Sequence, residues 1–77
     1  MNNAKRRVMD QIVKHSGTAS IGLLACDLRL ATDTVRRHVK SLVADGRAVF
    51  GWDGQALEPT VAELAERAQD ARVARHD

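Results

Sequence analysis

The chain has 77 residues, enough for one small domain, and its twelve basic and ten acidic residues give a net charge of +2. With one Trp, one Phe and no Tyr, we expect a core of aliphatic side chains between a few helices and a small sheet. A large enclosed substrate pocket is therefore not expected. The longest apolar run, residues 21–26, is too short to span a membrane, and a single cysteine excludes an internal disulfide and fits a reducing cytoplasm.

The charges are unevenly distributed along the chain. Residues 1–47 contain nine Lys or Arg and four acidic residues, a net charge of +5, whereas residues 48–77 contain three Arg and six acidic residues, a net charge of −3. The first segment is therefore the candidate for binding a polyanion.

The first predicted helix runs from Ala4 to His15, because Val8, Ile12 and Val13 fall on one of its sides. The pair Ser16-Gly17 is expected to end it.

A second helix is predicted from Ile21 to about Arg29, after a short extended segment at residues 18 and 19. Ser20 has the side chain of an N-cap residue. The inner face of this helix is expected to consist of Leu24, Ala25 and Leu28. Cys26 lies in the same apolar run, so we expect it to be buried as a small hydrophobic residue.

A third helix is predicted over about residues 33–45, with Thr32 or Asp33 as its N-cap and Gly46 at its left-handed C-terminal end. Its apolar side is formed by Val35, Val39, Leu42 and Val43. The far side carries Asp33, Arg37, Lys40, Ser41 and Ala44, with Thr34 and Arg36 on the flanks. This helix therefore has one face for the core and one for a partner, and His38, at the edge of the apolar arc, is expected to pack against the domain.

Two short strands are predicted at residues 47–50 and 55–58, joined by a tight Asp-Gly turn within residues 51–54. Trp52, near the tip of this hairpin, either packs on the domain or is an exposed contact for a protein partner.

Pro59 marks a boundary, which divides the chain into a domain at residues 1–58 and a C-terminal helical segment at residues 59–77. Thr60 and Glu63 form a capping box for a last helix from Val61 to about Arg75. Its apolar stripe consists of small residues: Val61, Leu64, Ala65, Ala68 and Ala71. Such a helix needs something to pack against, either its own domain or the same helix of a second subunit in a homodimer.

The order helix, short strand, helix, turn, helix and hairpin is typical of a winged helix-turn-helix domain, here with an additional C-terminal helix. Between residues 5 and 58, the sequence resembles the DNA-binding domains of DeoR-type and related bacterial regulators. The resemblance is carried by Leu24-Ala25, Leu28, Leu30, Thr34-Val35-Arg36-Arg37-His38-Val39, Leu42 and Gly46. It implies a mainly α fold with a small β-hairpin and a repressor-like transcriptional regulator that binds double-stranded DNA sequence-specifically.

In such a regulator, the third helix enters the major groove, where Arg can hydrogen-bond guanine O6 and N7 together. We expect Arg37 to be the first base contact and Lys40 to contact a phosphate. The full set of predicted DNA contacts is Lys5, Arg6, Thr32, Thr34, Arg36, Arg37, Lys40, Ser41 and Arg47. Lys5 and Arg6 are equally compatible with an ordinary charged surface. Arg47 is the only basic residue of the hairpin, so a wing that reads bases is not expected.

The alternative function is a winged-helix module that binds a protein partner through Trp52 and the acidic C-terminal helix. An enzyme is not expected, because no nucleophile, base and orienting group occur together. We also expect no cofactor, metal, membrane segment or small-molecule substrate, and a cytoplasmic, nucleoid-associated location.

Overall fold

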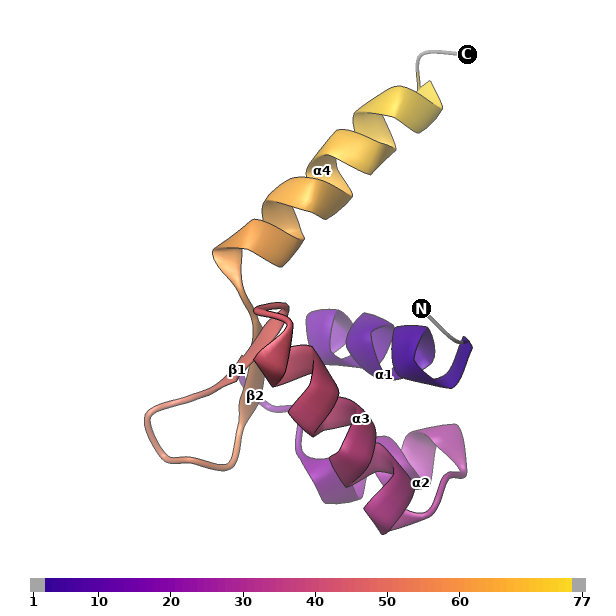
Figure 1. Ribbon diagram of the computed structural model, residues 1–77, viewed down its shortest axis with the longest axis vertical. Coiled ribbons are helices and arrows are strands. Elements are labelled where there is room, and N and C mark those ends of the chain that lie inside the picture. The colour runs from indigo at the N-terminus through magenta and orange to yellow at the C-terminus, as the bar shows by residue number, and fades with distance from the viewer. Residues whose placement is uncertain (1–2, 76–77) are drawn as a thin grey trace.

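Aliphatic residues at helical spacing produce a mainly helical structure with one small antiparallel sheet (Figure 1). The computed structural model describes residues 3–75, and side chains from residue 3 to residue 71. The elements are α1 (Asn3–Lys14), α2 (Ile21–Leu28), α3 (Thr32–Ala44), β1 (Ala48–Phe50), β2 (Leu57–Pro59) and α4 (Val61–Arg75). The predicted order of elements is confirmed.

The core lies between α1, α2, α3 and the inner face of the hairpin. Its buried members are Val8, Met9, Ile12, Ala19, Leu24, Ala25, Leu28, Val35, Val39, Leu42, Ala48 and Leu57. The predicted inner face of α2 is confirmed, but Cys26 is exposed and its predicted burial is wrong. Cys26 lies on the side of α2 away from the core, because a continuous apolar run in the sequence covers every side of a helix.

The ends of α2 and α3 follow from local chemistry. Ser20 is the N-cap of α2, as predicted, and its hydroxyl accepts a hydrogen bond from the Leu23 amide at 3.2 Å. Neither Thr32 nor Asp33 caps α3, because the helix begins one residue earlier and Ala31 occupies the N-cap position without a side-chain hydrogen bond. Gly46 follows α3 with a φ of 74°, which confirms the predicted left-handed position.

The hairpin loop is longer than predicted. Residues 51–56 join β1 to β2 instead of residues 51–54, because the Asp53 carboxylate accepts hydrogen bonds from the amides of Gln55 and Ala56. Leu57 also pairs with Ala19, whose carbonyl accepts a hydrogen bond from the Leu57 amide at 2.7 Å. The extended segment before α2 is therefore joined to β2.

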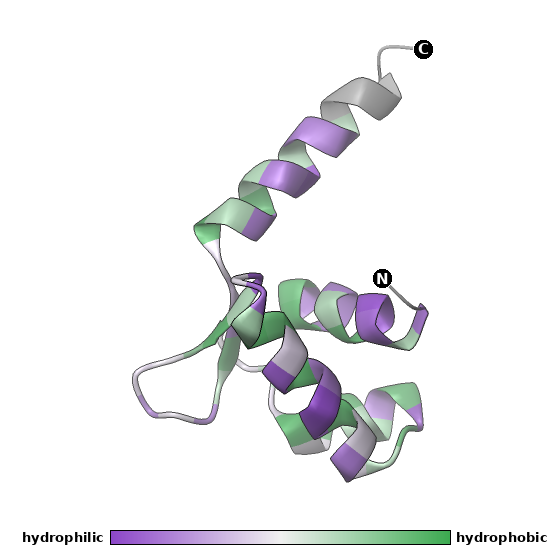
Figure 2. Ribbon diagram, viewed as in Figure 1, coloured by the Kyte–Doolittle hydropathy of each residue, from purple (hydrophilic) through white to green (hydrophobic). Residues whose placement is uncertain are grey.

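Helix α4 projects away from the other elements (Figure 1), and no side chain of residues 61–71 belongs to the aliphatic core. Polar and apolar residues alternate along it (Figure 2). None of the helices within residues 3–75 combines the length and apolar character needed to cross a membrane.

Candidate nucleic-acid interface

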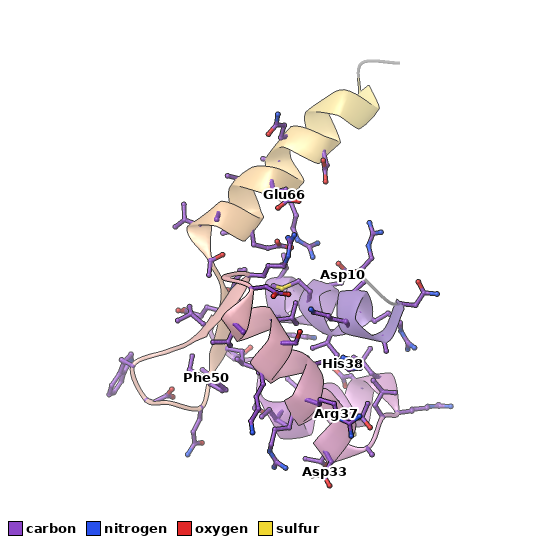
Figure 3. The ribbon with its side chains drawn as sticks, in the orientation of Figure 1. Asp10, Asp33, Arg37, His38, Phe50 and Glu66 are labelled. Atoms are coloured by element: carbon purple, nitrogen blue, oxygen red, sulfur yellow. The ribbon has the colours of Figure 1, made fainter. Side chains whose placement is uncertain are left out.

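The outer face of α3 carries three of the cationic side chains that the sequence predicts as DNA contacts. Arg36, Arg37 and Lys40 are exposed, whereas Val35 and Val39 of the same helix are buried. Asp33 and Arg37 lie in the first two turns of α3 (Figure 3). Helical periodicity thus separates a core face from a cationic outer face, as the sequence predicts.

Arg36 has an acidic partner on this outer face. Its Nη1 lies 2.8 Å from Oδ1 of Asp33, one turn earlier in α3. The pair remains in contact with solvent, since Asp33 is 87% exposed and Arg36 is 49% exposed. The exposed N-terminal half of α3 therefore carries an acceptor as well as donors. Thr32, also a predicted contact, is exposed in the same turn.

Lys5 and Ser41, two other predicted contacts, connect α1 to α3. Nζ of Lys5 donates to Oγ of Ser41 at 2.6 Å and to Oδ2 of Asp45 at 2.7 Å. The hydrogen bond from Lys5, with the charge of that lysine, lowers the pKa of Asp45 below its ordinary value of 3.8. Ser41 and Thr34 are both half-buried. The contacts of Lys5 and Ser41 set the position of α3 against α1.

Arg47 contacts α4. Its Nη1 lies 2.6 Å from the carboxylate of Glu63 and 3.1 Å from that of Glu66, and the hydrogen bond to Glu63 is the main cause of its raised pKa. Glu63 also accepts from Nε of Arg67 at 3.0 Å, and Nη2 of Arg67 lies 2.9 Å from Asp10 of α1. These contacts join the base of the hairpin, α4 and α1.

Glu63 was predicted only as part of a helix cap, but in the structure its carboxylate is buried, with the residue only 5% exposed. The predicted capping box forms in part. The Glu63 amide donates to the Thr60 hydroxyl at 3.2 Å, but the Thr60 amide donates to the carbonyl of Arg47. The Glu63 side chain instead binds the two arginines. Arg6 lies near this region and lines a cavity of about 250 Å³ with residues of α1, α4 and the hairpin base.

Trp52 at the hairpin tip is fully exposed, so of the two predicted environments the exposed one is found. The neighbouring Asp53 has a lowered pKa, because its carboxylate accepts hydrogen bonds from the backbone amides of Gln55 and Ala56. Phe50 and Ile21 line an open cavity of about 230 Å³ between the hairpin and the start of α2. The hairpin tip is thus aromatic and acidic.

Among the described residues, no group of three or more His, Cys, Asp or Glu side chains is arranged to hold a metal ion. His38 is half-buried on α3. Comparison with known proteins found no family model, no curated protein and no solved structure that matches the chain.

Proposed function

We propose that the chain is a winged helix-turn-helix protein that binds double-stranded DNA sequence-specifically and acts as a repressor-like transcriptional regulator. The order of elements supports this proposal, as does the pairing of Ala19 with Leu57, which places a short extended segment beside the hairpin. Such a protein would act on the nucleoid, in the cytoplasm.

The outer face of α3 is the observation that carries the proposal. A helix of 13 residues is about 20 Å long, and the major groove, about 12 Å wide, admits one helix. On this face Arg36, Arg37 and Lys40 are exposed. The opposite side of α3 is fixed to the core by the buried Val35, Val39 and Leu42, so the cationic face points outward. The face therefore offers donors for both base edges and phosphates.

Some of the predicted DNA contacts bind other residues of the protein, which reduces the number of side chains assigned to the interface. Arg47 is bound to two carboxylates of α4, and Lys5 and Ser41 brace α3 against α1. We therefore assign the main DNA contacts to Thr32, Arg36, Arg37 and Lys40. Lys5, Ser41 and Arg47 are assigned to holding the elements in place.

A salt titration of duplex binding tests the proposal. The logarithm of the affinity should fall linearly with the logarithm of the salt concentration, with a slope that corresponds to roughly three phosphates per protomer, one for each cationic side chain assigned to the interface. Absence of duplex binding at low salt would exclude the proposed function.

Two single variants separate base reading from phosphate contact. Arg37→Ala should reduce the preference for the best DNA sequence over its single-base variants, because Arg37 is proposed to contact a base edge. Lys40→Ala should weaken binding to all duplexes alike and reduce the salt slope by about one. If Arg37→Ala leaves the sequence preference unchanged, the role assigned to Arg37 is wrong.

We further propose that α4 pairs with the same helix of a second copy. Val61 is 84% exposed and Leu64 is 46% exposed, so both apolar side chains of α4 are open to a partner. A symmetric dimer would present two α3 helices to two half-sites. Sedimentation equilibrium should give a dimer mass that Leu64→Glu converts to a monomer mass, with Gln69→Glu as the control for added charge. A monomer at high protein concentration would contradict this assignment.

The second candidate function is a protein-binding module, which the full exposure of Trp52 favours. The two functions differ in two results. A protein-binding module would not bind a duplex with the salt dependence described above, and its binding to a protein partner would be lost in Trp52→Ala.

A further inference from the structure

The ion pair between Asp33 and Arg36 has a composition unlike that of a phosphate-binding site. Oδ1 of Asp33 and Nη1 of Arg36 are 2.8 Å apart at the exposed N-terminal end of α3, so the two charges offset each other. Phosphate contacts depend on positive charge, and a carboxylate beside the arginine would repel a phosphate that approached it. Lys40, one turn beyond Arg36, has no such acidic partner among the contacts of the described residues.

The same pair is well suited to a base edge. The guanidinium group is planar and carries several N–H donors, and the structure directs one of its nitrogens toward Asp33. The other donors remain for guanine, which offers two acceptors, O6 and N7, in the major groove. Holding the guanidinium in one orientation before binding reduces the conformational entropy that is lost on binding.

We propose that Asp33 is a specificity determinant, which holds Arg36 in position to contact guanine and keeps this arginine away from phosphates. This inference rests on the proposed DNA-binding function and adds that the preferred half-site contains a guanine contacted by Arg36. Asp33 acts through Arg36 and is therefore a positioning residue.

The proposal predicts opposite effects on specific and non-specific binding. In Asp33→Ala, Arg36 loses its partner and can turn to a phosphate, so non-specific affinity rises and the salt slope increases by about one. Discrimination at the guanine falls in the same variant. Arg36→Ala lowers that discrimination by roughly fivefold to 150-fold, the range expected for a bidentate contact. A residue that only stabilised the start of α3 would weaken binding to every duplex.

The test uses the full chain. A preferred duplex is first selected from a random pool, and its affinity and those of its single-base variants are then measured over a range of salt concentrations. The variants are Asp33→Ala, Asp33→Asn and Arg36→Ala, with Asp70→Asn of α4 as a control that also removes one exposed carboxylate. Circular dichroism of each variant establishes that its helices form.

The expected result is lower discrimination at one guanine together with tighter non-specific binding in both Asp33 variants, but not in Asp70→Asn. If the Asp33 variants bind all duplexes more weakly, or keep the original preference and salt slope, the proposal is overturned while the DNA-binding function stands. If the unmodified chain binds no duplex at low salt, both fail.

Discussion

Gly46 and Gly22 show how much depends on a single backbone position. Gly46 ends α3 with a φ of 74°, a conformation that side chains with a Cβ atom rarely adopt. Gly22 lies inside α2, where an added Cβ would meet no atom within 4 Å. The two glycines therefore have opposite roles.

We predict that Gly46→Ala lowers the free energy of unfolding by about 1–2 kcal/mol, because a left-handed alanine is strained. Gly22→Ala should raise it by about 0.5–1 kcal/mol, because alanine is the better helix former. Urea denaturation monitored by circular dichroism measures both changes. Effects of the same sign in the two variants would contradict the assigned backbone roles.

At the scale of residues, the sequence predicts the features that depend on near neighbours. Ser20 and Gly46 are examples, since a cap and a left-handed turn involve only adjacent residues. Arg29 could not be predicted in the same way. It adopts a φ of 56° after α2, a conformation usually taken by glycine, and nothing in its side chain indicates this. The exposure of Cys26 likewise depends on which side of α2 faces α3.

Among the elements, α4 differs from the other helices in how it is held. Charged contacts attach it: Arg47 binds Glu63 and Glu66, and Arg67 binds Asp10. Its apolar residues Val61 and Leu64 are exposed. The position of α4 therefore depends on the buried carboxylate of Glu63.

We predict that Glu63→Gln increases the rate of amide hydrogen exchange in α4 by roughly tenfold, because charged hydrogen bonds to both arginines are weakened. Glu66→Gln is the matched control, since it alters the same helix and the same partner, Arg47, at a site that is 57% exposed. Its effect should be smaller. Equal exchange rates in the two variants would show that burial of Glu63 does not hold α4.

The order of the elements could be predicted because α1, α2 and α3 each have an apolar period, and Thr60 and Glu63 mark the start of α4. The hairpin loop differs from the prediction because the Asp53 side chain binds two backbone amides and lengthens the turn. The sequence placed Arg47 among possible DNA contacts, and its contact with Glu63 depends on the antiparallel pairing of β1 with β2, which brings the residue before β1 beside the residues after β2. The cationic face of α3 could be predicted, because helical periodicity alone places its residues on one side. The ion pair of Arg36 with Asp33 could not, because it depends on the conformations of the two side chains.

For the whole molecule, two carboxylates determine part of the response to acid. The pKa of Asp45 is lowered by Lys5, and that of Asp53 by the amides of Gln55 and Ala56. A carboxylate with a lowered pKa in the folded state stabilises the fold above its ordinary pKa, and this stability is lost as the pH falls through the lowered value.

We therefore predict that the melting temperature falls as the pH decreases below about 4. Thermal melts between pH 2 and pH 7 measure this dependence. Lys5→Met should reduce the part due to Asp45, because the hydrogen bond and charge that lower its pKa are removed. An unchanged pH profile in this variant would contradict the role of Lys5.

The attachment of α4 through charges has a consequence for the whole assembly. Mobile ions weaken contacts between exposed charges, and at physiological ionic strength their screening distance is about 8 Å. Arg47 is 32% exposed and Glu66 is 57% exposed, so raising the ionic strength should weaken this contact more than the contacts of the buried Glu63. Salt concentration should therefore affect both the Arg47–Glu66 contact and the proposed binding of DNA.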